Sequence, residues 1–425
     1  MMDEQFLHYL WQFQQFNKIN LQTTAGEPIT VFKTGFLNTN AGPDFTDARL
    51  QIGEIEWVGS IEVHIKSSDW NLHNHQSDKS YENVILHVVW EYNRPILRQD
   101  GSEIPTLELR GLTDNSLRNK YRNLVENQSK ILCESQFSGI SALSKVLMLD
   151  KVLTRRLEEK AKLVDKLLVQ NNGDWEETTY QLLAKNFGFK LNSEPFLRLA
   201  KQTPLKILQK QRDNLIQIEA LLFGQSGLLN DSSDDDYSKK LWTEYQFLCK
   251  KYSLHCSQVS AHEWKFLRTR PTNFPTVRIA QFAQLLYSRK GFFSRLIQIE
   301  SAQELNEFFK INQSVYWQSH YNFGKESSVK MVGLGNDSIE NLIINSAIPL
   351  MVAYAQSVDN QALIEKAIRF LESIKAERNS ITQIWESLGV DLKTAYESQG
   401  YIELYNNYCS QKKCLQCNIG IEILK

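Results

Sequence analysis

Two carboxylates and a basic side chain lie at a spacing that suits metal-dependent chemistry. Asp44 follows a proline, Glu62 comes eighteen positions later, and His64 lies two residues past that glutamate. Mg²⁺ prefers oxygen ligands in octahedral geometry, and a bound ion polarises a phosphoryl oxygen and lowers the pKa of a water molecule. Asp44 and Glu62 are therefore predicted to share one Mg²⁺ (or Mn²⁺) ion in a phosphodiester-cleaving site. His64 or Lys66 would orient the water or stabilise the developing charge.

The elements that must position these side chains are two strands of one hairpin. Residues 48–52 alternate between apolar and polar, which is typical of a half-buried strand, and residues 55–65 continue the pattern after a turn. Neighbouring strands lie about 5 Å apart, so Asp44 at the entry of the first strand can reach Glu62 on the second. Because side chains alternate between the two faces of a strand, Glu62 shares one face with both basic residues.

The same residues resemble the motif of the PD-(D/E)xK nuclease superfamily, carried here by Pro43-Asp44 and Glu62-Val63-His64. The resemblance covers residues 1–112 and implies a core of helix, three strands, helix and strand. It also implies that Asp44 and Glu62 are metal ligands. His64 stands where the superfamily has lysine, and Lys66 on the same face can take over that role.

The resemblance further implies a catalytic glutamate on the first helix. A helix is expected over residues 3–16, and Glu4 would be that glutamate. An acid in the first turn also favours the helix dipole without any catalytic part, so both interpretations stay open.

A longer run of residues is similar to an uncharacterised bacterial family that is common in Bacteroidetes and is catalogued as a domain of unknown function. That family brings no established activity. The run comprises Gly42-Pro43-Asp44-Phe45, Glu62-Val63-His64, Ser68-Asp69-Trp70, His73-Asn74-His75, Asp78, Tyr81 and Leu86-His87-Val88-Val89.

Histidines are concentrated beside the motif, because four of the eight in the chain fall between positions 64 and 87. Residues 67–78 have no clear period and are predicted to form a loop, where functional residues concentrate. His73 and His75 can protonate a leaving oxygen, since histidine titrates near neutral pH. In a second interpretation, these side chains only form hydrogen bonds that hold the loop in place. His87 lies in an apolar strand and is predicted to be a core residue. In a third interpretation, His64, His73, His75 and Asp69 bind Zn²⁺.

Three of the six cysteines crowd the C-terminal region as Cys409, Cys414 and Cys417. The first residues are acidic and lack the basic-then-apolar pattern of a signal peptide, so the chain is predicted to be cytoplasmic, where clustered cysteines favour metal binding over disulfides. Three thiolates need a fourth ligand for Zn²⁺ or an iron–sulfur cluster. Cys133 is favoured, because one upstream cysteine with a C-terminal trio resembles the iron–sulfur staple of some helicase-associated nucleases. The other candidates are Cys256 and His255.

The rest of the chain is predicted to be helical. The 425 residues, 42% of them hydrophobic, suffice for two or three domains. The predicted fold class is α+β, with a mixed-sheet PD-(D/E)xK-like domain over residues 1–112 and a large all-α domain over residues 113–425 that ends in the cysteine-ligated metal site. Apolar spacing and the N-cap residue Asp174 predict helices near residues 143–168, 175 onward, 211–223, 237–252, 276–288, 303–310, 337–357, 360–374 and 380–388.

Charge also changes at the predicted domain boundary. Residues 1–112 hold 15 acids and 8 Lys or Arg, whereas the remainder holds 34 acids and 40 Lys or Arg. An acidic metal-binding module beside a mildly basic helical one suits a protein that handles nucleic acid. Two prolines stiffen residues 268–278, whose arginines either bind phosphates or pair with acids of neighbouring helices. These arginines are Arg268, Arg270 and Arg278.

Together these patterns predict a Mg²⁺-dependent hydrolase, a nuclease that cleaves DNA or RNA. Two alternatives stay open. The missing lysine favours a non-catalytic nucleic-acid-binding or scaffold protein on a degenerate nuclease fold, and the histidine loop favours a zinc-dependent hydrolase. The longest apolar run, residues 342–355, is too short and too interrupted to span a membrane, so a buried helix and no membrane partner are predicted.

Overall fold

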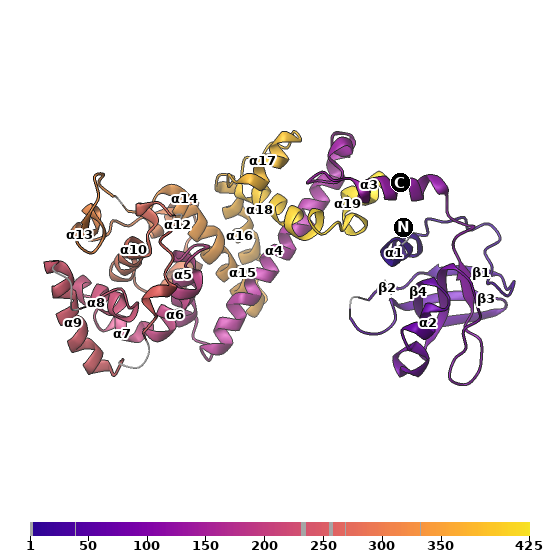
Figure 1. The fold of residues 1–425 in the computed structure, drawn as a ribbon, viewed down its shortest axis with the longest axis horizontal. Coiled ribbons are helices and arrows are strands. Elements are labelled where there is room, and N and C mark those ends of the chain that lie inside the picture. Colours follow the sequence, from indigo (N-terminus) through magenta and orange to yellow (C-terminus); the bar gives the residue numbers. More distant parts are fainter. Residues whose placement is uncertain (1–2, 39, 231–234, 255–257, 268, 332) are drawn as a thin grey trace. The chain divides into compact units, whose positions relative to one another are not determined.

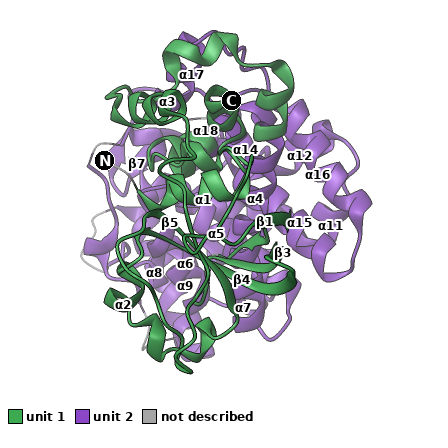
Figure 2. Ribbon diagram, turned by 90° about the vertical axis from the view of Figure 1, so that its right-hand side faces the viewer, with its two compact units in different colours: residues 1–148, 404–425 green, residues 149–403 purple. Residues whose placement is uncertain are grey.

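The structure is a computed structural model of the whole chain, and it describes residues 3–38, 40–230, 235–254, 258–267, 269–331 and 333–425 (Figure 1). The chain forms two compact units, coloured separately in Figure 2. Unit 1 comprises residues 1–148 and 404–425, and unit 2 comprises residues 149–403. The division therefore lies elsewhere than the predicted one near residue 112, and the C-terminal residues belong to unit 1.

Unit 1 is built on a mixed sheet in which the strands pair in the order β1-β3-β4-β5-β6, with β2 paired to β3. Strands β1, β3 and β4 are antiparallel, and β5 and β6 follow in parallel to β4. The predicted hairpin is confirmed as β3 and β4. The strands are β1 (Ile29–Lys33), β2 (Phe36–Leu37), β3 (Phe45–Ile52), β4 (Ile55–Lys66), β5 (Val84–Glu91) and β6 (Thr106–Glu108).

The connection from β4 to β5 is helical, which corrects the prediction of an irregular loop. Because the two strands are parallel, the chain must cross from one end of the sheet to the other between them. It does so through three single turns, α2 (Asp69–Leu72), η1 (His75–Ser77) and η2 (Lys79–Tyr81). This crossover carries the two loop histidines.

Helix α1 (Glu4–Gln12) covers one face of the sheet and is shorter than the predicted helix over residues 3–16. Its apolar residues Phe6 and Leu10 lie in one core with Ile61 and Val63 of β4. The predicted alternation along β4 is thereby confirmed, since the odd-numbered residues face this core and the even-numbered residues face the opposite side. Asp3 caps the helix by accepting a hydrogen bond from the backbone of Phe6 at 2.8 Å.

Gly59 of β4 lies where the chain has no room for a side chain. A β-carbon there would meet the carbonyl oxygen of Asn83 and the Cγ2 atom of Ile85, each at 2.5 Å. We expect Gly59→Ala to destabilise unit 1 by about 1–3 kcal/mol, because the start of β5 would have to move away from β4. Gly111→Ala is the matched control, since a β-carbon at that position would meet no atom within 4 Å. Differential scanning calorimetry should show a lowered melting temperature for the first variant only; equal values would contradict this account.

Unit 1 also contains segments that precede unit 2 in the sequence and segments that follow it. Helix α3 (Asn115–Glu126) packs on α1, where Tyr121 stacks on Phe6 with ring centroids 4.6 Å apart. The C-terminal residues return through the turns η7 (Tyr405–Cys409) and η8 (Cys414–Gln416) and the helix α19 (Asn418–Leu424). Leu415 and Leu424 join the core beneath the sheet. The 3-10 turn η3 (Glu134–Gly139) precedes α4 (Ala142–Gln170), whose range crosses the boundary between the units.

Unit 2 is helical and is organised around one large apolar core. The predicted helices are confirmed to within a few residues, and Asp174 accepts a hydrogen bond from the backbone of Glu177 as an N-cap. A two-stranded hairpin of β7 (His320–Asn322) and β8 (Lys325–Glu326) corrects the prediction that the region is all-α. The helices are α5 (Trp175–Phe187), α6 (Ser193–Gln202), α7 (Leu205–Gln209), α8 (Leu215–Gln225), α9 (Asp236–Tyr252), α10 (Pro275–Ser288), α11 (Phe292–Gln298), α12 (Ala302–Phe309), α13 (Val315–Ser319), α14 (Asn336–Leu342), η6 (Ile343–Ala347), α15 (Ile348–Ser357), α16 (Gln361–Ser373), α17 (Ser380–Ser387) and α18 (Ala395–Leu404).

The apolar run predicted as a buried helix forms the centre of unit 2. Residues Asn336–Ser357 are helical throughout, and the most apolar window has a mean hydropathy of 1.2. By length and composition this helix could cross a membrane, but 72% of that window is buried inside the fold. Its burial is that of a core helix.

Glu219 is a carboxyl group buried in unit 2, and it makes the stability of this unit depend on pH. Burial raises its pKa to about 7, although Tyr237 and Ser314 both donate hydrogen bonds to it. The stabilisation that comes from protonated Glu219 is therefore full below about pH 4.5 and is lost as the pH rises through about 7.

We expect the unfolding free energy of the wild type to fall by about 2 kcal/mol relative to Glu219→Gln between pH 5 and pH 8. Urea unfolding at the two pH values measures this difference, with Glu386→Gln on the exposed face of α17 as the control. An identical pH dependence in Glu219→Gln and wild type would show that Glu219 is not the titrating group.

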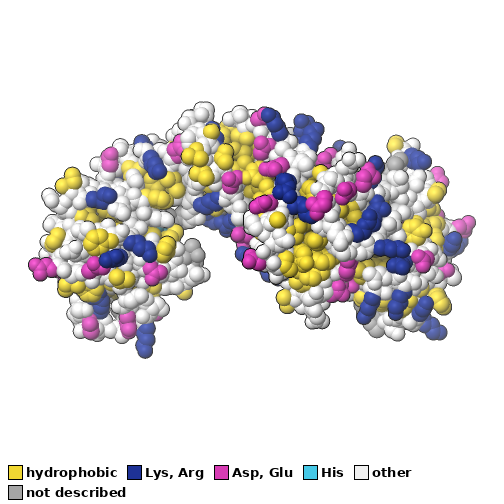
Figure 3. All heavy atoms as spheres, turned by 180° about the vertical axis from the view of Figure 1, so that it is seen from behind, with side chains coloured by type: hydrophobic (Ala, Val, Ile, Leu, Met, Phe, Trp, Pro, Cys, Tyr) yellow, Lys and Arg dark blue, Asp and Glu magenta, His cyan; other side chains and the backbone are white. Residues whose placement is uncertain are grey.

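Charges of both signs are interspersed over the face of the molecule that Figure 3 shows. Basic and acidic side chains alternate with apolar patches on both units, so neither unit presents a surface of a single sign on that face. The excess of basic residues in the second part of the sequence therefore forms no single basic surface on the face shown.

Candidate metal-dependent active site

Asp44 and Glu62 lie against each other at the point where β3 begins beside β4. The backbone N–H of Asp44 donates to Oε2 of Glu62 at 3.1 Å, and the backbone N–H of Val63 donates to Oδ2 of Asp44 at 3.0 Å. The predicted pair is therefore brought together by reciprocal hydrogen bonds that fix both carboxylates. Glu62 is only 4% exposed, so its carboxylate is buried and does not lie on a solvent-exposed sheet face.

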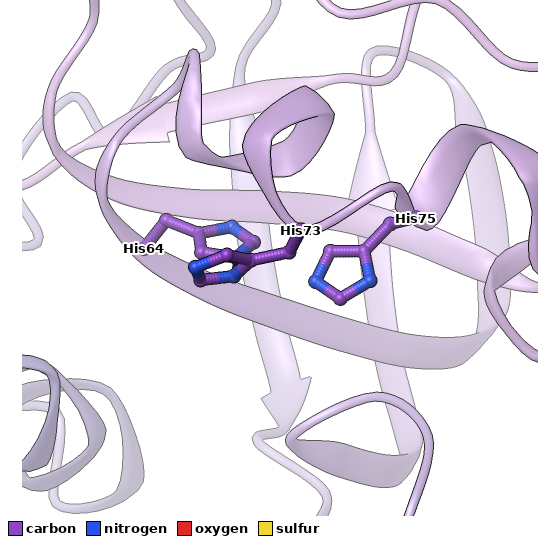
Figure 4. Close-up of side chains that lie close together, drawn as sticks. All are labelled: His64, His73 and His75. Carbon is purple, nitrogen blue, oxygen red and sulfur yellow. Dashed lines mark hydrogen bonds between the residues drawn. The ribbon is translucent and has the colours of Figure 1, made fainter.

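Three histidines lie close together, as Figure 4 shows, and two of them contact Glu62. One nitrogen from each of His64, His73 and His75 lies within 4.8 Å of the other two. His64 Nε2 is 3.1 Å from His73 Nδ1. His64 is buried, His75 is half-buried and His73 is exposed, so the cluster reaches from the core to the solvent.

Local backbone structure explains how His73 and His75 reach the same space. The side chain of Asp69 accepts a hydrogen bond from the backbone of Lys66 at 2.9 Å, which turns the chain out of β4 into α2. Asn74 then adopts a left-handed conformation with a φ of 61°, which asparagine tolerates better than most residues. This residue ends α2 and begins η1, so the histidines on either side of it turn back toward β4.

Glu62 joins the three imidazoles to the carboxylate pair. Its Oε1 atom lies 3.2 Å from His75 Nε2 and 3.6 Å from His64 Nε2. Burial raises the pKa of Glu62 to about 7, and the nearby charge of Asp44 adds to this effect, whereas the contact with His75 lowers the pKa. A buried carboxylate among imidazoles with no bound cation is costly, and a metal ion at this point would stabilise its charged form.

His87 fixes the orientation of His64 from inside the sheet. His64 Nδ1 and His87 Nε2 are 2.8 Å apart, and both side chains are at most 1% exposed. Burial lowers the pKa of His64 to about 3 and lowers that of His87 as well, so both rings are neutral near pH 7. When His64 Nδ1–H donates to His87, the Nε2 lone pair of His64 faces the cluster. This is how metal-binding histidines are usually oriented.

Helix α1 contributes a histidine that the sequence analysis did not single out. His8 Nε2 lies 3.3 Å from Oδ2 of Asp44. Burial lowers the pKa of His8, but the hydrogen bond and the charge of Asp44 more than offset that effect, so the pKa is raised overall. Glu4 is one helical turn earlier, and its pKa is raised by burial and by Asp44. The sequence did contain a signal for His8: Glu4 and His8 are four residues apart, which places both side chains on one face of a helix.

The remaining predicted site residues lie apart from this cluster or outside the described residues. Lys66 is exposed at the end of β4, beyond the buried part of the strand. Arg270 is exposed in unit 2, whereas Arg278 is 5% exposed and donates to Asn273 and Ser338. Arg278 also lines a cavity of about 660 Å³ in unit 2. Three predicted candidates, Arg268, His255 and Cys256, lie outside the described residues.

A cavity of about 370 Å³ opens beside His75. Tyr81 stacks on His75 with ring centroids 3.9 Å apart, and Trp70 lines the same cavity. The indole Nε1 of Trp70 is buried and has no hydrogen-bond partner among the residues that the structure describes. The cavity lies next to one of the three imidazoles, that of His75, and its wall also includes the acids Asp78, Glu82 and Asp100.

The donor set of the cluster consists of three imidazole nitrogens and one carboxylate oxygen, with the second carboxylate of Asp44 adjacent. Imidazole suits Zn²⁺ and other transition ions, whereas all-oxygen sets suit Mg²⁺. These residues would be able to hold such an ion, which would lower the pKa of a bound water molecule.

Comparison with known proteins gives one result. The family model described as a protein of unknown function, DUF2851, matches residues 4–380. No curated protein and no solved structure matches the chain. The matched range includes every residue of the cluster and ends before the three C-terminal cysteines.

Proposed function

The chain belongs to the DUF2851 family, whose function is unknown, and from its own residues we propose that it is a metal-dependent hydrolase that cleaves phosphodiester bonds in nucleic acid. The observation that carries this proposal is the convergence of His64, His73 and His75, two of which, His64 and His75, lie against the carboxylate of Glu62. The fixed contact between Asp44 and Glu62 supports it.

The donor types favour a transition ion over Mg²⁺ alone. Three of the four converging donors are nitrogen atoms, and Mg²⁺ prefers oxygen. Mn²⁺ and Zn²⁺ accept both donor types, so we take one of them as the resident ion. His64, His73, His75 and Glu62 would hold it, and Asp44 would be a further carboxylate ligand. This proposal joins the predicted carboxylate site and the predicted histidine site into one centre.

The order of the secondary structure supports nucleic acid as the substrate class. A helix, the strands β1, β3 and β4 in antiparallel pairing with the short β2 beside β3, a crossover of three helical turns and the strand β5 parallel to β4 follow one another, an order similar to the nuclease core that the sequence motif resembles. Asp44 begins the second of these strands and Glu62 lies on the third, which are the motif positions. His64 occupies the lysine position as a ligand, so in this proposal no lysine is required.

The side chains around the ion divide the chemistry between them. An ion held by these residues would supply a Lewis acid for a phosphoryl oxygen and an activated water molecule. His8, held 3.3 Å from Asp44, is placed to donate a proton to the leaving oxygen. His87 holds His64 in the ligating orientation. In this proposal the cavity beside His75 receives a nucleotide, whose base would stack on the half-buried ring of Tyr81.

The proposal is tested by incubating the metal-stripped full chain with labelled single- and double-stranded DNA and RNA. Mn²⁺, Zn²⁺ and Mg²⁺ are added back separately. We expect cleavage with Mn²⁺ or Zn²⁺, little with Mg²⁺, and loss of cleavage in Asp44→Asn. Asp47→Asn, an exposed residue of the same strand, is the matched control and keeps full activity. Salt-sensitive binding without cleavage under any ion would overturn the proposal and support the non-catalytic alternative.

A further inference from the structure

Unit 2 contains a cavity of about 660 Å³, a volume typical of sites that bind small organic molecules. Its walls are formed by the end of α5 and the residues that follow it, by the start of α10, by α14 and by residues 375–378 after α16. All of these segments belong to unit 2, so the cavity lies within one compact unit. A β-carbon on Gly188 would meet the carbonyl oxygen of Asn192 at 2.2 Å, so residues 188–192 fold closely back on themselves and form a defined wall.

Arg278, on the first turn of α10, places a buried positive charge at this cavity. The residue is 5% exposed, and its guanidinium lies 4.3 Å from the ring centroid of Phe189, which also lines the cavity. It donates hydrogen bonds to Oε1 of Gln281 at 2.9 Å, to Oδ1 of Asn273 at 2.5 Å and to Oγ of Ser338 at 3.0 Å. All three acceptors are uncharged groups, so these bonds fix the guanidinium in place without neutralising it.

The charge of Arg278 has no counter-ion in the part of the chain that the structure describes. None of the arginine ion pairs of the described residues includes it, and its Nε atom is buried without a hydrogen-bond partner among them. Burial lowers the pKa of this guanidinium to about 10, so it stays protonated near pH 7. An isolated buried charge is costly, and an anion in the cavity would supply the missing partner.

The other charged side chains of the lining add to this preference for an anion. Glu377 already accepts hydrogen bonds from Gln399 at 2.8 Å and from Asn379 at 3.1 Å. The described lining carries four cations and three acids, so its formal charge is positive, and the cations other than Arg278 are exposed. The cations are Lys190, Arg278, Lys375 and Arg378, and the acids are Asp337, Glu340 and Glu377.

We propose that this cavity binds a phosphorylated small molecule of nucleotide size, whose phosphate group pairs with Arg278 and whose organic part lies beside Phe189 and Leu191. A phosphate group carries about two negative charges near pH 7 and several acceptor oxygens, and arginine is well suited to its recognition. A lone phosphate ion would leave most of a cavity of this size empty. The site lies in unit 2, whereas the proposed hydrolase centre lies in unit 1, and it does not depend on the hydrolase activity.

The test is isothermal titration of adenosine monophosphate, inorganic phosphate and adenosine, each separately, into the metal-stripped full chain. Removing metal ensures that no ion at the proposed hydrolase centre binds the phosphate group. We expect adenosine monophosphate to bind, inorganic phosphate to bind more weakly, and adenosine to show no measurable binding. Equal affinity for adenosine and adenosine monophosphate, or no binding of either phosphate compound, would overturn the proposal.

Two pairs of variants locate the binding at this cavity. Arg278→Met removes the buried charge and should weaken the binding of adenosine monophosphate by about 10–100-fold, the loss expected for a charged hydrogen bond. Arg369→Met, an exposed residue of α16 outside the lining, is its matched control and keeps the wild-type affinity.

The second pair changes only exposed residues and therefore preserves the fold. Lys375→Glu should weaken the same binding by about 2–5-fold, and Lys330→Glu, which lies outside the lining, should not. Wild-type affinity in a folded Arg278→Met protein would overturn the proposal. If that variant does not fold, equal affinity in Lys375→Glu and Lys330→Glu overturns it instead.

Discussion

Glu62→Gln should abolish metal-dependent cleavage while leaving the fold intact. Glutamine keeps the shape of the side chain and one carbonyl oxygen, but it removes the negative charge that faces His64 and His75. Replacing even outer residues of metal sites costs roughly 10–100-fold in activity or metal affinity, so the loss of a direct ligand should exceed that range. Initial rates of oligonucleotide cleavage at saturating Mn²⁺ measure the effect.

Glu54→Gln provides the control for this prediction. Glu54 is exposed in the turn between β3 and β4, at the far end of the same hairpin, and lies away from the cluster. It should keep full activity. Circular dichroism would establish that both variants are folded, and a folded Glu62→Gln protein with wild-type cleavage would remove Glu62 from the site.

His64→Ala should weaken Mn²⁺ or Zn²⁺ binding by more than about 100-fold, because it removes a ligand that a buried partner holds in place. His8→Ala should weaken ion binding less than His64→Ala does and should lower the turnover further than that loss of affinity explains, because His8 contacts Asp44 and is not one of the three converging imidazoles. The two variants therefore separate ion binding from proton transfer.

Isothermal titration of Mn²⁺ into metal-stripped protein measures the affinity. His262→Ala, an exposed residue of unit 2, is the control for loss of an imidazole elsewhere. Equal Mn²⁺ affinity in His64→Ala and His262→Ala would show that His64 is not a ligand.

The sequence predicted the hairpin and its faces because these depend on local pattern. Alternation along residues 55–65 determines which side chains share a face, and a turn of two residues determines the register with the preceding strand. The contact between Asp44 and Glu62 follows from that register. Helices of unit 2 were predicted for the same reason, since their apolar spacing is a local property.

What the sequence could not predict depends on packing between distant segments. His8 reaches Asp44 only because α1 packs across the sheet, and a histidine on a helix gives no sign of its tertiary partner. The role of His87 likewise depends on its pairing with β4 and not on its apolar surroundings. The return of residues 404–425 to unit 1 depends on an apolar contact with the sheet core through Leu415 and Leu424.

The central claim is that one transition ion lies between the three imidazoles and Glu62. Crystals of the full chain grown with Mn²⁺ and measured at an anomalous wavelength test it most directly, because they locate the ion without reference to activity. The account predicts a peak within about 2.0–2.3 Å of one nitrogen each of His64, His73 and His75 and of Oε1 of Glu62. A peak held by Asp44 and Glu62 without any imidazole, or the absence of a peak at the cluster, would contradict it.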